Sequence, residues 1–285
     1  MKKFKVKIFT TFMVAILIIT TLLTGCSKNS GTIKIATKPM TEQFILGEML
    51  SLLIKDNTNL NVEITKGVGG GTSNIHPAIV KGDFDLYPEY TGTGWSTVLK
   101  EEGIPDNDTL YKELKAKYEE QYKLKWVGLY GFNNTYGLVI RKDIAEKYNI
   151  KTYSDLAKYA PELNFGAEYD FYEREDGYNA LCLAYGFKFK KTSDMDIGLK
   201  YQAINSKEID VMNVFTTDGQ LSASQVVVLK DTIEKYPELE AVLMKMQDII
   251  TDSEMAKLNY EVESNGRDEK DVAKEFLISK GLLKE

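Results

Sequence analysis

The sequence has a single histidine, His76, and two cysteines, Cys26 and Cys182. One histidine removes the usual general base from most catalytic schemes. The two cysteines form neither a CxxC pair nor a Cys/His spacing of the kind that binds metal. The sequence therefore predicts no cofactor, no metal site and no enzymatic activity.

Positive charge is also in deficit, because 36 lysines and arginines face 42 aspartates and glutamates, a formal charge of −6. Four of those lysines lie within residues 1–7, a stretch without any carboxylate, so the rest of the chain is more acidic still, at −10. Proteins that bind nucleic acid need the opposite balance, with basic residues to neutralise phosphates. We therefore expect no nucleic-acid partner.

The one long apolar run, Ile8–Leu23, has 16 residues, whereas about 20 are needed to span a bilayer. Basic residues precede it, as in a secretory signal. It ends in Leu-Thr-Gly-Cys, which resembles a bacterial lipobox with Cys26 as the lipid-modified first residue. We expect a lipoprotein signal peptide over 1–25, a polar linker over 26–31, and attachment to the extracytoplasmic face of the membrane through the N-terminal lipid. An uncleaved membrane anchor is the alternative.

Strand and helix patterns alternate along the remaining residues, about 255 in number. This alternation is typical of an α/β fold with a parallel sheet. Strands are expected at 32–37, 61–65, 84–86, 136–141, 209–214 and 226–229, and helices at 41–54, 73–81 and 111–122, after 142 and 154, and in three stretches from 232 onward.

Polar segments follow several of these strands. Gln43, Gly69–Thr72 and Tyr87–Thr93 each come after a predicted strand, and residues 215–219 come after a later one. Ligands of open α/β sheets bind at the carboxyl ends of strands. Two such clusters, far apart in the sequence, indicate two lobes that face a ligand cleft.

Residues 84–95 read Phe-Asp-Leu-Tyr-Pro-Glu-Tyr-Thr-Gly-Thr-Gly-Trp. Aromatic faces on a loop attract cations without supplying a counter-charge. Tyr90 and Tyr136 are the tyrosines that this reasoning favours as cation-binding residues, and Tyr87, beside Pro88, is assigned to packing. The carboxylates Asp83, Asp85 and Glu89 lack a nucleophile or orienting partner for acid/base catalysis.

The Gly-rich segment Gly67–Thr72 superficially resembles a phosphate cradle at the start of a helix. It lacks the lysine of a nucleotide-binding loop. A tight turn is therefore the favoured interpretation.

Six segments resemble one protein family, and they span nearly the whole mature chain in the same order. They are Thr37-Lys-Pro-Met-Thr-Glu-Gln43, Gly82-Asp-Phe-Asp-Leu-Tyr-Pro-Glu-Tyr-Thr-Gly-Thr93, Gly131-Phe-Asn-Asn-Thr-Tyr136, Arg174-Glu-Asp-Gly177, Gly198-Leu-Lys-Tyr-Gln202 and Thr216-Thr-Asp-Gly219. The chain is similar to the solute-binding lipoproteins of ABC importers for glycine betaine, carnitine and choline. The resemblance implies a two-lobed binding protein that closes on a quaternary ammonium compound and delivers it to the permease and ATPase subunits of an importer.

The same resemblance implies which residues bind the ligand. An aromatic cage maps onto Tyr90, Tyr136 and Phe215, with Thr93 at a position that separates broad from choline-restricted members. Gln43 matches a pocket-lining glutamine. Thr217 and Asp218, in the last motif, complete the candidate set. A trimethylammonium group donates no hydrogen bond, so that aromatic faces, each contributing roughly 0.5–2 kcal/mol, suit it.

One departure from the family concerns the segment after Asp231. Where relatives carry a further fifteen to twenty residues, with a fourth cage tyrosine and a strand that returns to the first lobe, this chain continues directly to Thr232. Tyr236 is a candidate replacement. The departure motivates an alternative function, a surface interaction or sensory lipoprotein that has lost transport binding. We expect lobe I to comprise 32–130 and 231–285, and lobe II to comprise 131–230.

Overall fold

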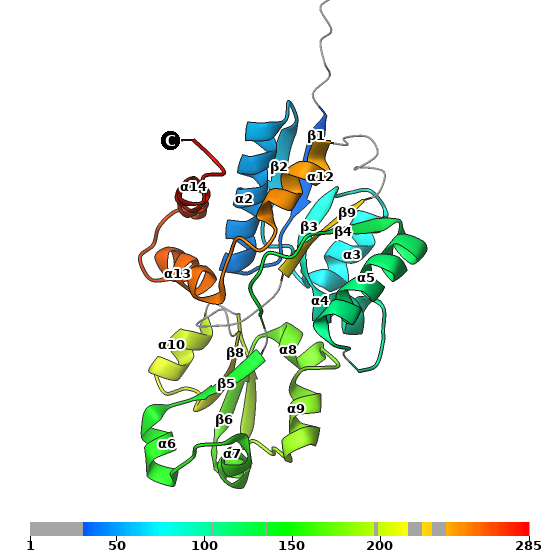
Figure 1. Ribbon diagram of the computed structural model, residues 1–285. Helices are drawn as coiled ribbons and strands as arrows, with labels where there is room; N and C mark the ends of the chain where they lie inside the picture. The colour runs from blue at the N-terminus through cyan, green and yellow to red at the C-terminus, as the bar shows by residue number, and fades with distance from the viewer. Residues whose placement is uncertain are drawn as a thin grey trace, which may run out of the picture. The chain divides into compact units, whose positions relative to one another are not determined.

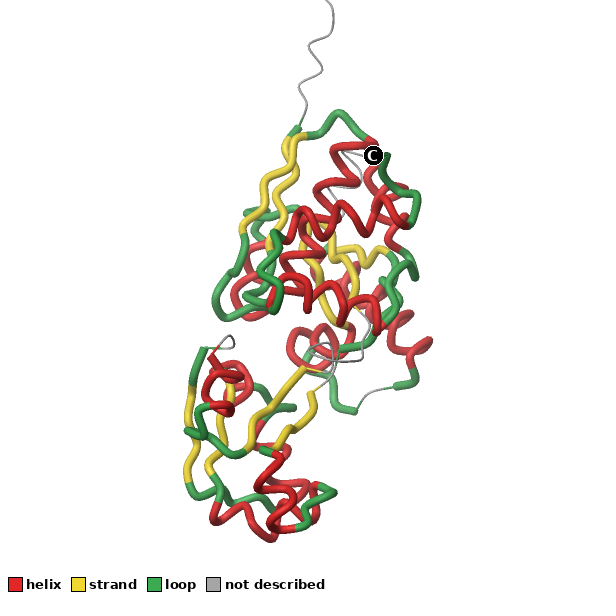
Figure 2. Tube along the Cα trace, turned by 90° about the vertical axis from the view of Figure 1, so that its left-hand side faces the viewer, coloured by secondary structure: helices red, strands yellow, loops and turns green. Residues whose placement is uncertain are grey.

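The structure, a computed structural model, describes residues 31–103, 105–134, 136–196, 199–215, 224–229 and 238–284. Within these residues the strands form one sheet of five and one of four, and helices pack against each sheet (Figures 1 and 2). The predicted α/β class is confirmed.

The first sheet has the strand order β2-β1-β3-β9-β4. Its strands are β1 (Thr32–Ala36), β2 (Asn61–Thr65), β3 (Leu86–Tyr90), β4 (Leu124–Val127) and β9 (Ser224–Leu229). β1 pairs in parallel with β2 and β3, whereas β9 runs antiparallel to β3 and β4. Since β1 and β3 are parallel, the segments that follow them meet at one edge of the sheet.

Two clusters of buried side chains cover the two faces of this sheet. Ile33, Ile35 and Leu86 belong to the cluster that includes α2 and the C-terminal helices. Tyr87 and Trp126 belong to the opposite cluster, with α3 and α5. Adjacent residues of one strand thus point to opposite faces, as the period of two requires. The helices around this sheet are α2 (Thr41–Asn57), α3 (Thr72–Val80), α4 (Thr91–Thr93), the π-helical turn η1 (Gly94–Val98), α5 (Asn107–Tyr122), α12 (Glu238–Leu243), η4 (Met244–Met246), α13 (Asp252–Glu263) and α14 (Glu269–Ser279).

The second sheet has the order β5-β8-β6-β7. Its strands are β5 (Tyr136–Ile140), β6 (Asn164–Ala167), β7 (Lys191–Asp194) and β8 (Val211–Phe215), and its helices are α6 (Lys142–Tyr148), α7 (Tyr153–Tyr159), η2 (Ala160–Glu162), α8 (Tyr169–Glu173), α9 (Tyr178–Tyr185) and α10 (Lys200–Asn205). β8 is antiparallel to β5, and the register sets Tyr136 opposite Phe215. The two aromatic residues, 79 positions apart in the sequence, are therefore neighbours on one sheet.

Helix α5 begins four residues before the predicted start at 111. The side chain of Asp106 accepts the backbone N–H of Thr109 at 3.1 Å, which satisfies one of the free donors at the helix start. Leu110, Leu114 and Tyr118, at helical spacing, are buried against the sheet. The cap, rather than the apolar period, sets where the helix begins.

The prediction of a strand ending at 86, followed by an aromatic loop, is wrong. β3 continues through the Tyr-Pro-Glu-Tyr segment to Tyr90, and all five of its residues are buried. A proline has no backbone N–H to donate to a β-ladder, so that a proline in the sequence argues against a central strand. Here the ladder between β1 and β3 holds a single pair, Ile35 with Leu86, so that β3 carries Pro88 beyond the end of that ladder.

The expectation that the segment missing after Asp231 takes the returning strand with it is also wrong. β9, which includes the Val-Val-Val-Leu sequence, is itself the returning strand, since it lies between β3 and β4 in the first sheet. Strands β4, β6 and β7, of four residues each, were not predicted, because they are too short for a clear alternation.

No helix within the described residues is long and apolar enough to cross a membrane. The run Ile8–Leu23 and Cys26 lie outside the described residues. Cys182, a free cysteine, is partly buried against the core of the second sheet.

Gly94 offers a test of the packing between η1 and the first sheet. A Cβ atom at Gly94 would lie 2.7 Å from Trp126 Cζ2 and 2.9 Å from the Tyr118 hydroxyl, closer than side chains approach. We expect Gly94→Ala to lower the free energy of unfolding by about 1–3 kcal/mol, measured by urea denaturation. Gly92→Ala is the control, since a methyl group at position 92 would meet no atom within 4 Å. Equal stability of the two variants would contradict this packing.

Candidate ligand-binding site

A cavity of about 850 Å³ is lined by residues that follow β1 and β3 of the first sheet and by residues of the second. Tyr90 ends β3 and directly precedes α4, and Thr93 closes α4. Both line the cavity. The turn from β3 into α4 therefore places the Tyr90 ring and the Thr93 hydroxyl at the carboxyl end of the sheet, where ligands of such folds bind.

Three of the aromatic residues that line the cavity are Tyr90, Tyr136 and Phe215. The rings of Tyr136 and Phe215 lie 5.2 Å apart, tilted by 38°, as their register on β5 and β8 dictates. Phe171 supports Tyr136 from the core, with ring centroids 4.7 Å apart. The second sheet thus supplies a fixed pair of aromatic walls, and β3 supplies a third ring.

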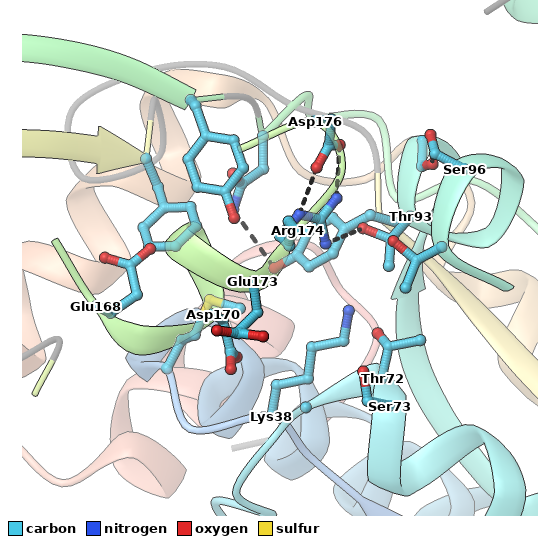
Figure 3. Close-up of a pocket in the computed structure, with 18 of the residues that line it drawn as sticks. Lys38, Thr72, Ser73, Thr93, Ser96, Glu168, Asp170, Glu173, Arg174 and Asp176 are labelled. Atoms are coloured by element: carbon cyan, nitrogen blue, oxygen red, sulfur yellow. Dashed lines mark hydrogen bonds and ion pairs between the residues drawn. The ribbon is translucent and has the colours of Figure 1, made fainter. Parts of the chain in front are cut away.

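Of the described residues, Arg174 and Lys38 are the two cations that both line the cavity and lie beside these rings. The guanidinium of Arg174 is 5.7 Å from the ring centroid of Tyr136, and its Nη1 donates to Thr93 Oγ1 at 3.4 Å. Asp176 holds the other side of the guanidinium with two bonds of 2.7 Å. Figure 3 shows Arg174 between Asp176 and Thr93, with Lys38 and Thr72 nearby. Burial lowers the pKa of Arg174, but the Asp176 carboxylate outweighs burial and keeps the pKa of the Arg174 guanidinium above its ordinary value.

Lys38, the second cation, is held by the buried carboxylate of Glu89. Glu89 Oε1 accepts the Lys38 ammonium and the N–H of Tyr90, and Oε2 accepts the Thr72 hydroxyl at 2.7 Å. Glu89 is fully buried and Lys38 is 5% exposed. Burial lowers the pKa of Lys38, and the Glu89 charge opposes that shift. The Lys38 ammonium also lies 4.6 Å from the ring centroid of Tyr90.

Gln43 does not line the cavity, contrary to expectation, but is buried behind Tyr90. Its Nε2 donates to the Tyr90 hydroxyl at 3.2 Å, and this hydroxyl donates to Glu42. Asn134, on the segment between the two sheets, donates to Glu42 at 3.2 Å and to the Tyr90 hydroxyl at 3.4 Å. The first turn of α2 therefore fixes the tip of Tyr90, and Gln43 contacts that hydroxyl rather than the cavity.

Carboxylates outnumber cations around the cavity. Seven line it, Glu168, Asp170, Glu173, Glu175, Asp176, Asp194 and Asp196, against Lys38, Lys100 and Arg174. Glu168 is paired with the buried Lys200 at 2.6 Å, and the Lys200 ammonium lies 5.1 Å from the Phe215 ring. Burial and the nearby Glu168 raise the pKa of Asp170. No group of three or more metal-ligating side chains is arranged for a metal ion within the described residues.

The structure brings four of the predicted residues, Tyr90, Thr93, Tyr136 and Phe215, to one cavity. Thr217, Asp218 and the candidate replacement Tyr236 lie outside the described residues. Among the site residues that sequence reasoning missed are Lys38, Arg174 and Tyr169. A signal for two of them was present, because Lys38 and Arg174 lie in motifs that carry the family resemblance.

Residues 31–279 match the model of the substrate-binding domain of ABC-type glycine betaine transport systems. The chain belongs to this family. It is a solute-binding component of an ABC transporter, and the family is one of transport proteins rather than enzymes.

Individual relatives agree. The chain is 35% identical, over 298 aligned positions covering 96% of each protein, to the carnitine transport binding protein of Listeria monocytogenes serotype 1/2a (strain 10403S). It is 45% identical, over 265 positions, to the ergothioneine transport permease/ergothioneine binding protein of Helicobacter pylori (strain G27). That alignment covers 87% of this chain but only 47% of the Helicobacter protein, so the chain spans about half of that relative's length.

A solved structure described as a glycine betaine/carnitine/choline ABC transporter is 30% identical and superimposes with a TM-score of 0.69, covering 88% of this chain and 99% of that one. The two-lobed fold expected from the sequence is confirmed by this likeness. Solute-binding proteins of ABC importers work outside the cytoplasm, and this is the compartment of the chain.

Glu89 provides a stability test of the site. Glu89→Ala removes the partner of a buried ammonium, which we expect to lower the free energy of unfolding by about 3–5 kcal/mol in urea denaturation. Glu63→Ala, at an exposed position of the neighbouring strand β2, is expected to change it by less than about 0.5 kcal/mol. Similar losses in both variants would contradict the assigned role of Glu89.

Proposed function

We propose that this chain is the lipid-anchored solute-binding component of an ABC importer, and that it takes a zwitterion carrying a trimethylammonium group and a carboxylate. The single observation that carries the proposal is that the rings of Tyr90, Tyr136 and Phe215 line one cavity with the cations Lys38 and Arg174. A zwitterion with these two ends is the class of ligand that both sets of groups recognise.

The aromatic end consists of Tyr90, Tyr136 and Phe215. A trimethylammonium group has a diffuse charge over three methyls and no N–H, so that it gains from ring faces by area burial and by cation–π attraction. Tyr136 and Phe215 form adjacent walls on the second sheet, while Tyr90 belongs to the first. A ligand held by all three rings contacts both sheets.

The cationic end consists of Arg174, Thr93 and Lys38. A guanidinium presents paired N–H donors in the geometry of a carboxylate, and charge-assisted hydrogen bonds of this kind are about twice as strong as neutral ones. The contact of Arg174 with Thr93 at 3.4 Å is long and joins the second sheet to the α4 segment of the first. A ligand carboxylate at this point would form stronger hydrogen bonds with Arg174 and Thr93 than these two residues form with each other.

The relatives' names agree with this class, because carnitine and ergothioneine each carry both a trimethylammonium group and a carboxylate, as glycine betaine does. Choline has the ammonium group and lacks the carboxylate. The cavity, of about 850 Å³, is large for glycine betaine alone and leaves room for a longer substituent. Carnitine and ergothioneine are therefore the preferred candidates.

The remaining features of the proposal follow from the sequence. Residues 1–25 serve as a signal peptide, Cys26 carries the lipid after a cleavage before it, and 26–31 form a linker. Lobe I is built on the first sheet and lobe II on the second, so that β9, which was expected in lobe II over 131–230, belongs to lobe I. Permease and ATPase subunits of an importer are the protein partners, and the chain performs no chemical conversion of its ligand.

The alternative function, a surface interaction or sensory lipoprotein that has lost transport binding, now has less support. It rested on the missing segment after Asp231 and its returning strand. β9 fills that place in the first sheet. Tyr169 of α8 also lines the cavity, with an exposed fraction of 60%, and adds an aromatic group that the sequence pattern had not supplied.

Calorimetric titration of the purified chain with glycine betaine, carnitine, ergothioneine and choline tests the function. We expect at least one zwitterion to bind with a dissociation constant on the order of micromolar, and choline to bind more weakly. Arg174→Ala should weaken that zwitterion by at least about thirty-fold and change choline by less than about three-fold. Arg267→Ala, whose guanidinium pairs with Glu261 and Glu275, is the control. Equal losses for choline and zwitterions would refute the carboxylate site.

Tyr169→Ala tests the additional aromatic wall. We expect it to weaken the bound trimethylammonium ligand by about five- to thirty-fold, in the range expected for Tyr136→Ala, because each aromatic face contributes about 1–2 kcal/mol. Tyr260→Ala is the matched control, since Tyr260 has an exposed fraction of 57% and does not line the cavity. Unchanged affinity of Tyr169→Ala would remove this residue from the site.

A further inference from the structure

Glu42 is a buried carboxylate that contacts the cavity wall from behind. It is the second residue of α2 and is 3% exposed. Its Oε1 accepts a hydrogen bond from the Tyr90 hydroxyl and another from the Asn134 amide, the latter at 3.2 Å. The Tyr90 hydroxyl in turn accepts the Gln43 amide at 3.2 Å. The proton of the phenol is thus directed at a carboxylate, while two amides supply the other bonds.

The position of Glu42 favours its charged form. α2 has 17 residues, and Glu42 lies in its first turn, where the helix dipole and free backbone N–H groups stabilise an anion. Burial and the negative charge of Glu42 raise the pKa of Tyr90 well above its ordinary value, so that the phenol keeps its proton and remains the donor. The Tyr90 phenol is therefore the neutral donor of the pair, and the Glu42 carboxylate is the acceptor.

This hydrogen bond changes the ring as well as holding it. A phenol that donates to a carboxylate gains electron density from the lengthened O–H bond, and the face of its ring becomes more negative. Cation–π attraction grows with that negative potential. The ring already holds one cation, since the Lys38 ammonium lies 4.6 Å from its centroid.

Phe215 is the contrasting wall. It has no hydroxyl, and the buried Lys200 ammonium lies 5.1 Å from its centroid, held by Glu168 and Asn213. A cation beside the ring lowers its attraction for another one, and no phenolic hydrogen bond offsets that loss. Of these two walls, Tyr90 is the electron-rich one.

We propose that Glu42 is a positioning residue for the quaternary ammonium ligand, which it attracts by polarising and orienting the ring of Tyr90. The inference rests on the proposed function, because it requires a cationic group against that ring. It predicts that the carboxylate matters for the charge of the ligand and not for its shape.

A double-mutant cycle on the purified protein tests this. Calorimetry is used with glycine betaine and with 3,3-dimethylbutanoate, in which an uncharged tert-butyl group replaces the trimethylammonium group; these are the charged ligand and its isostere. Glu42→Gln keeps the size and the acceptor and removes the charge. We expect it to weaken the charged ligand by about five- to ten-fold and the isostere by less than about two-fold. A general distortion of the site would weaken both ligands equally and would overturn the proposal.

The second arm separates polarisation from a direct attraction between Glu42 and the ligand. Tyr90→Phe removes the hydroxyl, and in that background Glu42→Gln should change affinity for the charged ligand by less than about two-fold. An undiminished effect in that background would assign Glu42 a through-space role and refute the polarisation. Glu48→Gln, on the same helix and paired with Lys66, is the control for charge removal from α2.

A ligand-free measurement keeps the inference distinct from the proposed function. In protein labelled with carbon-13 at tyrosine Cζ, the resonance that Tyr90→Phe removes identifies Tyr90. Glu42→Gln should move that resonance upfield, away from the phenolate range, and Glu48→Gln should leave it in place. An unmoved resonance refutes the inference whatever the protein binds. A moved resonance with no binding of any quaternary ammonium compound refutes the proposed function alone.

Discussion

A single buried carboxylate, that of Glu89, fixes the carboxyl end of the first sheet. It accepts Lys38 from the segment after β1, Thr72 from the start of α3, and the N–H of Tyr90 at the end of β3. A buried charge must keep its partners, because an unpaired one costs several kcal/mol. These three segments, distant in the sequence, are therefore held together, and they form one wall of the cavity.

Both sheets contribute residues to the site. The first supplies Tyr90 and Thr93 from a strand end, and the second supplies Tyr136 and Phe215 from paired strands and Arg174 from the segment after α8. Each aromatic ring has a protein cation beside it, at 4.6 to 5.7 Å. Under the proposed function, a ligand ammonium group shares these rings with resident charges, and the seven carboxylates around the cavity offset that positive charge.

Strand-end reasoning predicted Tyr90 at the carboxyl end of a strand, and the family resemblance grouped it with Thr93, Tyr136 and Phe215. The antiparallel pairing of β5 with β8, which sets Tyr136 beside Phe215, left no pattern in the sequence. Strand-end reasoning could not place Arg174, since its bond to Thr93 joins residues 81 positions apart and leaves no local pattern. Gln43 was expected in the cavity wall, but it lies behind Tyr90 because the first turn of α2 points into the core. The strand predicted at 84–86 was cut short before Pro88, since the partner strand β9, which pairs with β3 as far as Tyr90, lies far along the chain.

The position of β9 in the first sheet also affects the order in which this chain folds. Its residue Val228 pairs with Leu86, about 140 positions earlier, and β9 alone of the described strands occupies the place between β3 and β4. Pairings of such sequence separation form slowly, because a long loop must close first. The first sheet stays incomplete, with two unpaired strand edges, until most of the chain has been synthesised. A polypeptide that must cross a membrane before it folds benefits from this delay, and a chain truncated before β9 would expose those edges to aggregation.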